Sequence, residues 1–532
     1  MKKPLELKNL TIEQKVGLLL LARSPIDTAD KAFMLDMLKN RCLGGIHLSP
    51  KQHQGRNAAY GFVTDLPQTE LKDEVAEFLA AADYPVLMCE DMELGFREGM
   101  QLPSPMAIAA TDSEELAYEF ARITAIEAKA MGFNLVFGPI MDIGMNPLSS
   151  CVGVRTFGSD PKRVARMSAA AVRGYQDNGM VVTGKHYPGF GESPVDSHIG
   201  MVYLNGDEKL LLERELKPYI ESMKKADLSG VMVGHIMVPK IDDKYPATLS
   251  KKLIGLLRST GYDGLVMTDS LAMVGLTNFF SLPDCHKLAM AAGNDMVMTS
   301  YRTTAKEAYG YLLDAYRSGM VSEAQINASA ARVIAAQNKT LKPASQATLN
   351  NRERAAAERM ARDSITVKLN GADSAAIDPN GRHLFIFQRG NLFMNEITGQ
   401  AFREPSDLEL AERCVRERFK NSKITLIDQY SDRVQNENIL KESMEYDSVV
   451  WVTYNKSLSY MGSSDYTGRT LSLISGMGNK VSAVVLFGNP YAARDLPKTK
   501  RILYGFEGEC QRYAIDALAG VFKPTGKLPV SF

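Results

Sequence analysis

The chain has 532 residues, which is too long for one ordinary domain and indicates about two or three. The Lys+Arg and Asp+Glu totals are both 62, so the formal net charge is zero. This balance removes the simplest argument for a nucleic-acid partner or an anionic membrane surface. The six cysteines show no CxxC spacing, which favours free thiols over a zinc site or a disulfide framework.

The N-terminal segment contains a short apolar run, Val16 to Ala22, which follows the charged residues Glu13 and Lys15. Because this run is short and lacks a small-residue cleavage site, we interpret the segment as an amphipathic helix and not as a signal peptide. No run in the chain approaches the ~20 apolar residues that a membrane-spanning helix needs. We expect a cytoplasmic monomer or homodimer with no membrane partner and no nucleic-acid partner.

A repeating pattern occupies the chain from about residue 40 to about residue 300, in which an apolar run ends in a polar residue and a helical segment follows. Continuous apolar runs fit strands that are buried on both faces, as in a parallel sheet, and the segments between them fit crossover helices. Seven such units in one block favour a (β/α)8-type TIM barrel, in which the strand ends converge on one face. The runs are 45–47, 84–91, 133–142, 181–186, 229–235, 264–269 and 295–300.

The domain organisation follows from where this pattern stops. We predict a catalytic barrel domain at 1–338, a helical linker at 339–365 and a C-terminal domain at 366–532. In the last domain, strands predicted near 383, 424, 448, 481 and 501 alternate with helices, which indicates a smaller doubly wound α/β sandwich. Its first strand is not followed by GxGxxG, so we expect no dinucleotide site, and neither a metal nor another cofactor is required.

The segment 181–198 runs from an apolar stretch into a loop rich in glycine and proline. It carries Lys185, His186, Asp196 and His198, and the whole chain has only seven histidines. Barrel enzymes present catalytic side chains in this way, on loops that follow strands. The alternative is a solvated loop with two ordinary histidines. If the barrel forms, this segment meets polar groups at other strand ends in one pocket: Asp91, His235 and Asp269.

Four short motifs occur in a fixed order. They are Asp91-Met-Glu-Leu-Gly95, Val154-Arg-Thr-Phe-Gly-Ser-Asp160, Lys185-His-Tyr-Pro-Gly-Phe-Gly191 with Asp196-Ser-His198, and Val266-Met-Thr-Asp269. Together they resemble glycoside hydrolase family 3, especially its β-N-acetylglucosaminidase branch. The matching family segments are a D-x-E-x-G sugar-binding turn, an RSFG-D-P loop, KHFPGHG…DSH and the nucleophile strand. The tail, 524–532, is similar to the end of the second domain in that family.

The resemblance implies a retaining exo-β-N-acetylhexosaminidase that forms a covalent glycosyl-enzyme on Asp269. It assigns the acid/base role to His198, with Asp196 as its partner. The assignment is chemically reasonable because a nearby carboxylate can orient an imidazole and stabilise its protonated form. A neutral imidazole also avoids repelling an anionic acceptor such as phosphate. The alternative for Asp269 is an aspartate that only caps the next helix. The alternative for His198 is a surface histidine that lies beside Asp196.

Six further residues are candidates for binding a carbohydrate substrate. Some have an alternative explanation: Arg155 bracing its loop against Asp160, Lys185 pairing with Asp142, and His235 as a satisfied structural residue. We expect Asp142 itself to be structural. The candidates are Asp91, Arg97, Arg155, Lys185, His186 and His235.

Departures from the family pattern leave the exact sugar open. Phe190 stands where the family has a histidine, Leu94 replaces one glycine, and Arg97 is what remains of the downstream arginines. A family 3 β-glucosidase or β-xylosidase and a β-N-acetylglucosaminide phosphorylase are therefore alternatives. For a β-glucosidase the acid would be a carboxylate of the second domain, where Glu507 and Glu509 are available. A catalytically weak sugar-binding protein is the alternative of another class.

Overall fold

The computed structural model describes residues 2–48, 68–97, 99–300, 302–341, 349–389, 392–394, 401–403, 408–455, 457–458, 462–463 and 466–532. The chain forms two compact units. The barrel unit comprises Met1–Met100, Ala117–Asn146 and Pro161–Asn350. The sheet unit comprises Gln101–Leu116, Pro147–Asp160 and Asn351–Phe532. Two segments from the N-terminal half therefore belong to the sheet unit, and the division is not a single point along the chain.

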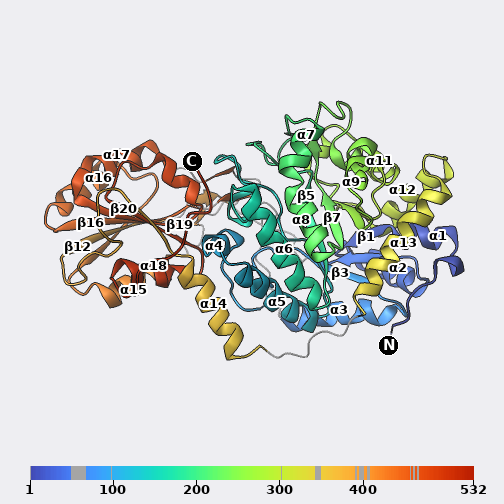
Figure 1. Ribbon diagram of the computed structural model, residues 1–532, viewed down its shortest axis with the longest axis horizontal. Helices are drawn as coiled ribbons and strands as arrows, with labels where there is room; N and C mark the ends of the chain where they lie inside the picture. Colours follow the sequence, from blue (N-terminus) through green and yellow to red (C-terminus); the bar gives the residue numbers. More distant parts are fainter. Residues whose placement is uncertain are drawn as a thin grey trace. The chain divides into compact units, whose positions relative to one another are not determined.

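The barrel unit is built on eight parallel strands, as the sequence predicts (Figure 1). The strand order is β10-β1-β2-β3-β4-β5-β7-β9, and a bridge between Met267 and Met296 closes the ring. The strands are β1 Leu20–Arg23, β2 Gly45–His47, β3 Leu87–Glu90, β4 Leu135–Val136, β5 Val181–Tyr187, β7 Gly230–Val233, β9 Leu265–Thr268 and β10 Val297–Met298.

Only the first strand of the barrel falls where we expected a helix. The helix α1, Ile12–Leu18, starts with a capping box between Thr11 and Gln14, but it ends before the apolar run does. The rest of that run forms β1, Leu20–Arg23, so the prediction of one helix through Ala22 is wrong. A four-residue apolar run that directly follows a helix has no periodicity of its own, and it is indistinguishable from another helical turn in the sequence.

Helices surround the barrel strands (Figure 1). Each buries its apolar face. In α6, for example, Val164, Met167 and Val172 are buried at helical spacing, and Pro161 occupies the first turn. The larger helices along this part of the chain are α2 Thr28–Lys39, α3 Gln68–Ala81, α5 Glu114–Ala130, α6 Pro161–Asp177, α8 Lys217–Ala226, α9 Lys251–Ser259, α11 Leu282–Ala292, α12 Ala305–Arg317 and α13 Glu323–Lys339. Within the described residues, no helix is both long and apolar enough to cross a membrane.

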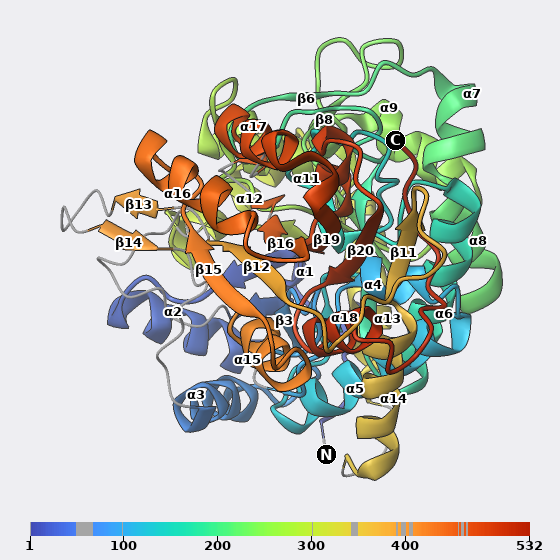
Figure 2. The same cartoon turned by 90° about the vertical axis from the view of Figure 1, so that its left-hand side faces the viewer.

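The sheet unit contains a six-stranded sheet in the order β11-β20-β19-β16-β12-β15 (Figure 2). All neighbours are parallel except β11 and β20, which pair antiparallel. Helices α15 and α18 cover one face, and α16 and α17 cover the other, which is the predicted doubly wound sandwich (Figure 1). The strands are β11 Thr366–Leu369, β12 His383–Gln388, β15 Lys423–Ile427, β16 Ser448–Asn455, β19 Val481–Gly488 and β20 Arg501–Phe506.

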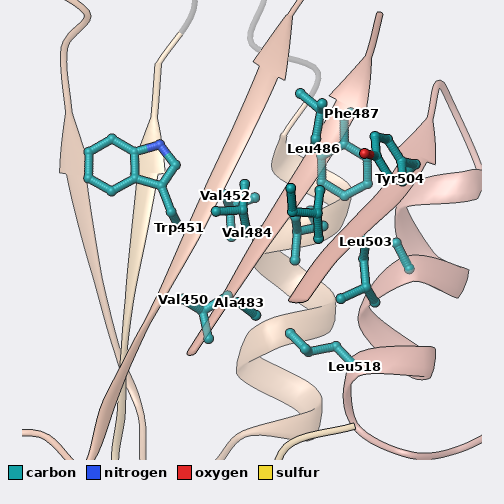
Figure 3. Close-up of a cluster of buried hydrophobic side chains, with 14 of the residues drawn as sticks. Val450, Trp451, Val452, Ala483, Val484, Leu486, Phe487, Leu503, Tyr504 and Leu518 are labelled. Atoms are coloured by element: carbon teal, nitrogen blue, oxygen red, sulfur yellow. The ribbon is translucent and has the colours of Figure 1, made fainter. Parts of the chain in front are cut away.

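The helices of the sheet unit are α14 Asn351–Asp363, α15 Glu409–Arg418, α16 Arg433–Ser443, α17 Gly468–Met477 and α18 Cys510–Leu518. Residues 342–348 of the predicted linker lie outside the described residues. The core of this unit forms where the central strands meet helix α18 (Figure 3). All eight residues of β19 are buried, and Trp451, Phe487 and Leu518 pack in the same cluster. Burying a side chain of this size contributes about 1.5–3 kcal/mol.

The C-terminal tail explains why two N-terminal segments belong to the sheet unit. The backbone N–H of Lys527 donates to the carbonyl of Ala110, and the N–H of Ser159 donates to the carbonyl of Pro529. The Cβ of any larger residue at Gly158 would lie 2.3 Å from that same Pro529 carbonyl oxygen, so this contact requires glycine. The tail thus connects 101–116 and 147–160 to the same unit as the sheet.

Candidate active site

The carboxyl ends of the barrel strands carry most of the predicted site residues. Asp91 follows β3, Lys185 and His186 lie within β5, His235 follows β7, and Asp269 follows β9. Parallel strands in a closed barrel present their carboxyl ends on one face. The barrel unit therefore holds the residues that the sequence singled out at strand ends.

Lys185 forms the first group of contacts at this face. Its Nζ lies 2.9 Å from Asp91 Oδ1 and 2.5 Å from Glu93 Oε1, and its side chain is only 3% exposed. One buried ammonium thus holds two carboxylates together, and Asp91 remains 48% exposed. Glu93 is not one of the candidate residues predicted from the sequence, although it lies in the Asp91 to Gly95 motif.

His186 lies between two carboxylates. Its Nδ1 is 2.7 Å from Asp142 Oδ2, and its Nε2 is 3.8 Å from Asp269 Oδ2. Asp142 also accepts from the backbone N–H groups of His186 and Phe190. The Phe190 ring, which stands in the place of a family histidine, packs edge-on against His186 with 5.3 Å between centroids. Asp142 is therefore structural in its contacts, and it fixes the ring that faces Asp269.

Asp269 is buried, and burial alone would raise its pKa. His186, His235 and Lys185 act in the opposite direction, together with the N–H of Ser270, and they hold the pKa of Asp269 below its ordinary value. The Ser270 N–H donates to Asp269 Oδ1 at 2.6 Å. Asp269 is consequently a fixed anion at the end of a barrel strand.

Asp196 and His198 contact each other directly. Asp196 Oδ1 lies 2.6 Å from His198 Nδ1 and accepts the backbone N–H of His198 at 2.8 Å. The carboxylate is buried, whereas the imidazole is 18% exposed. Because a carboxylate only accepts, Nδ1 carries the proton in this contact, so a proton exchanged with a substrate would pass through Nε2.

The loop that carries this pair is attached to the segment that follows Asp269. The N–H of Gly275 donates to the Ser197 carbonyl at 3.1 Å, and Ser197 Oγ lies 3.7 Å from Met273 Sδ. A Cβ on Gly275 would lie 2.4 Å from the Gly200 carbonyl oxygen and 2.7 Å from that of Ser197. The close approach requires glycine, and it couples the Asp196–His198 loop to the Asp269 segment.

His235 is completely buried and both of its nitrogens are satisfied by the protein. Nε2 lies 2.8 Å from the carbonyl of Ser270, and Nδ1 lies 2.8 Å from Thr248 Oγ1. Burial lowers the pKa of His235, so the ring is neutral and donates from Nε2 while it accepts from the threonine hydroxyl. These contacts favour the structural alternative for His235: it positions the residue next to Asp269.

The two arginine candidates differ in location. Arg97 lies half-buried in the loop after β3 in the barrel unit. Arg155 belongs to the sheet unit, where it ends the 3-10 turn η3, Gly153–Arg155, and its guanidinium donates to the carbonyl of Cys151.

A buried carboxylate lies beneath the loop that follows β5. Glu215 ends the π-helical turn η4, Leu211–Glu215, and its Oε1 pairs with Arg214 Nε at 2.7 Å. A Cβ on Gly189 would lie 2.6 Å from Glu215 Oε2. Burial raises the pKa of Glu215 to about 7, although Arg214 opposes the shift. Glu215 lies in no motif and at no predicted strand end, so the sequence alone does not single it out.

A cavity of about 380 Å³ lies at the opposite end of the barrel and contains none of the candidates. Ser229 and Leu265, at the start of β7 and β9, line it together with Arg332 and Lys339. These two cations are paired with Asp263 and Asp227, and this end of a barrel is ordinarily the one that provides stability. We therefore place the candidate active site at the carboxyl ends of the strands.

A barrel with an ionised aspartate at a strand end and an Asp–His pair in a loop offers a carboxylate and a proton donor, the two kinds of group that glycoside cleavage with retention needs. Residues 11–336 match the model of the Glycosyl hydrolase family 3 N terminal domain. The chain belongs to glycosyl hydrolase family 3.

Curated relatives share the barrel part of the chain. Beta-hexosaminidase A of Pseudoalteromonas piscicida is 30% identical over 267 residues, which is 46% of this chain and 44% of the relative. The beta-hexosaminidase of Idiomarina loihiensis is 31% identical over 240 residues, 43% of this chain and 71% of the relative. The match to the first of these, like that to a beta-N-acetylglucosaminidase/beta-glucosidase of Cellulomonas fimi, spans only about half of the relative's length.

Solved structures match both units. A glycoside hydrolase family 3 beta-N-acetylglucosaminidase from Paenibacillus sp. str. FPU-7 superimposes with a TM-score of 0.81 at 26% identity, covering 98% of this chain and 99% of that one. The beta-glucoside phosphorylase BglX has a TM-score of 0.82 at 22% identity, with 99% of this chain and 95% of that one covered. At that identity the second likeness shows the fold alone.

Proposed function

We propose that the protein is a retaining glycoside hydrolase that removes a terminal β-linked N-acetylglucosamine-type sugar. The observation that carries this proposal is the contact of the Asp196–His198 loop with the segment after Asp269, through Ser197 and Gly275. Retention requires a nucleophile and an acid/base group that act on the same anomeric carbon. The family membership and the names of the relatives agree with this reaction class.

The first chemical step forms the glycosyl-enzyme. The Asp269 carboxylate attacks the anomeric carbon, and the bond from that carbon to the leaving oxygen breaks. His198, protonated on Nε2, gives its proton to the leaving oxygen as the bond breaks. Asp196 holds the imidazolium in position through Nδ1. The low pKa of Asp269 keeps the nucleophile ionised at the pH where histidine can donate a proton.

The second step releases the sugar. Neutral His198 takes a proton from water through Nε2, and the water oxygen attacks the anomeric carbon. The ester bond to Asp269 breaks, and the carboxylate is regenerated. Attack on opposite faces in the two steps returns the original β configuration. At the end of the cycle His198 has regained its proton and Asp269 its negative charge. These steps require neither a metal nor an organic cofactor.

The remaining residues hold the sugar in this proposal. Asp91, which is exposed and fixed by Lys185, accepts from sugar hydroxyls. Arg97 supplies a further donor from the loop after β3. Arg155, whose contact with the Cys151 carbonyl lies within the sheet unit, stays a prediction from the sequence. His186 contributes mainly by its position beside Asp269.

A phosphorylase is the second candidate, because the proposed base is an imidazole and not a carboxylate. A neutral base would not repel phosphate, so phosphate could replace water as the acceptor in the second step. The product would then be a sugar 1-phosphate, and the protein's activity would rise with phosphate concentration.

The test is a panel of aryl β-glycosides with and without phosphate, applied to the natural chain, Asp269→Asn and His198→Ala. We expect cleavage of the β-N-acetylglucosaminide by the natural chain, and strong losses in both variants. Near-natural cleavage by either variant of a phenyl β-N-acetylglucosaminide, whose leaving oxygen needs a proton, would show that the assignment is wrong. Phosphate-dependent release identifies the phosphorylase, and binding of the sugar without turnover identifies a sugar-binding protein.

A further inference from the structure

His47 ends strand β2 and had no assigned role, although the sequence places it at a strand end like the other candidates. Its side chain is buried, with 3% of the residue exposed. Within the part of the chain that the structure describes, neither ring nitrogen has a hydrogen-bond partner. Buried polar groups in native proteins are nearly always paired, so an unpaired ring at this position requires an explanation.

Other buried histidines of the described chain are fully satisfied by the protein. His235 bonds to Thr248 and Ser270, as described above. His286 contacts the Leu282 carbonyl at 2.7 Å and Thr299 Oγ1 at 3.3 Å. His383 has two partners as well, the Ser448 hydroxyl and the Asp378 carbonyl. His47 thus differs from these structural histidines, because both of its ring nitrogens lack a hydrogen-bond partner among the described residues.

The register of the barrel places His47 at the candidate active site. His47 pairs with Arg23 of β1, whose guanidinium reaches Ser270 Oγ at 3.3 Å, so both side chains point to the interior. The His47 ring also contacts Phe137, with 4.8 Å between centroids. Phe137 follows β4, and β3 lies between β2 and β4 in the sheet, so this contact crosses the barrel interior.

The ring is a neutral donor and acceptor. Burial lowers the pKa of His47 to about 3, and Arg23 and Lys185 contribute in the same direction. Asp91 and Asp269 oppose the shift but do not outweigh it. Neutral imidazole offers one N–H and one lone pair, and a sugar hydroxyl needs both kinds of partner.

We propose that His47 is a substrate-binding residue that hydrogen-bonds a hydroxyl group of the terminal sugar held at Asp269. This inference rests on the proposed function and extends it to a specificity-determining contact. Among the described residues, the ring nitrogens have no hydrogen-bond partner, and the ring lies inside the barrel at the end of β2, which pairs with β3, the strand that precedes Asp91. A site built to bond a hydroxyl discriminates against the analogue that lacks it, because the buried partner is then left unpaired.

The test compares a deoxy series of substrates in the natural chain, His47→Leu and His47→Gln. The substrates are aryl β-N-acetylglucosaminides that lack the 3-, 4- or 6-hydroxyl. We expect the natural chain to lose about 10- to 100-fold in kcat/KM with one of them. His47→Leu should lose a similar factor on the parent substrate and show no further loss with that deoxy sugar. His47→Gln, which keeps a donor and an acceptor, should recover part of the discrimination.

His286→Leu is the matched control, because it removes a buried histidine that is satisfied by the protein. We expect it to lower Tm and to leave the deoxy pattern intact. His47→Leu should keep or raise Tm, since it removes polar atoms that lack partners in the free protein. An unchanged deoxy pattern in His47→Leu would overturn the proposal.

Calorimetric binding of N-acetylglucosamine and its deoxy analogues separates this inference from the proposed function. Binding that depends on His47 without any turnover supports the contact and contradicts the hydrolase. Turnover with the same deoxy pattern in all variants contradicts the contact and supports the hydrolase. Absence of both binding and turnover in the natural chain contradicts both.

Discussion

His186 Nε2 lies 3.8 Å from Asp269 Oδ2, while Nδ1 of the same ring lies 2.7 Å from Asp142 Oδ2. The imidazole therefore connects a fully buried carboxylate to the proposed nucleophile. His186 is the largest of the influences that lower the pKa of Asp269 against the effect of burial. Asp142 does not touch the reacting atoms in this account, and it acts by holding His186.

Asp142→Asn should reduce kcat/KM by roughly 10- to 100-fold, the loss expected for one hydrogen bond to a charged group of about 1.5–3 kcal/mol. The amide can present its NH2 to Nδ1, which reverses the tautomer that faces Asp269. Asp243→Asn is the control, since Asp243 is exposed in the loop after β8, Ile236–Met237. Equal activity of the two variants on an aryl β-N-acetylglucosaminide would contradict the positioning role.

His198→Ala should show a loss that depends on the leaving group. Cleavage of a poor leaving group needs the acid, so we expect kcat/KM to fall by about 10²- to 10⁴-fold. The loss should be within about 10-fold for a dinitrophenyl glycoside, which needs no proton. Added azide should restore turnover and give a β-glycosyl azide, because this anion needs no general base. The same loss on both substrates would argue against His198 as the acid.

Gly275→Ala should lower kcat without changing the catalytic residues. The new Cβ would lie 2.4 Å from the Gly200 carbonyl oxygen and 2.7 Å from that of Ser197, so the loop with Asp196 and His198 must move. A displacement of about 1 Å can cost on the order of 10²-fold in rate. Gly310→Ala is the control, because a Cβ at Gly310 in α12 meets nothing within 4 Å. Natural kcat in both variants would show that the loop contact is dispensable.

The sequence predicts the barrel and its polar strand ends because most of the apolar runs stop at an ionisable residue such as Asp269 or His186. It does not predict β1, since Leu20–Arg23 directly follows a capped helix with no turn signal between them. It also misses β11, Thr366–Leu369, whose two exposed residues leave it without a buried strand's continuous pattern.

Side-chain partners are harder to predict than strand ends, because they come from strands that are distant in the chain. The pairing of Asp142 with His186 and the place of Glu93 beside Lys185 depend on such contacts. The hydrogen bonding of His47 is equally hard to predict. The sequence shows a histidine at a strand end, but it does not show whether the ring nitrogens have partners among the described residues.

Glu215 should make folding stability depend on pH. Its pKa is about 7 in the folded chain, against an ordinary value near 4.5. A raised folded pKa gives stability that is complete below pH ~4.5 and is lost as the pH rises to about 7, by up to about 3 kcal/mol. Glu215→Gln should remove this decline in urea unfolding between pH 5 and pH 8. Glu213→Gln, at an exposed position of the same turn, should keep it. A decline that persists in Glu215→Gln would contradict the assignment.

Mass spectrometry of His198→Ala, quenched in acid during turnover of the dinitrophenyl β-N-acetylglucosaminide, tests whether Asp269 is the nucleophile. The second step is slow in this variant, because no base activates water, so the covalent intermediate should accumulate. We predict a mass increase of one N-acetylhexosamine, located on the peptide that contains Asp269. Continued turnover without an adduct, or an adduct on another residue, would contradict the account.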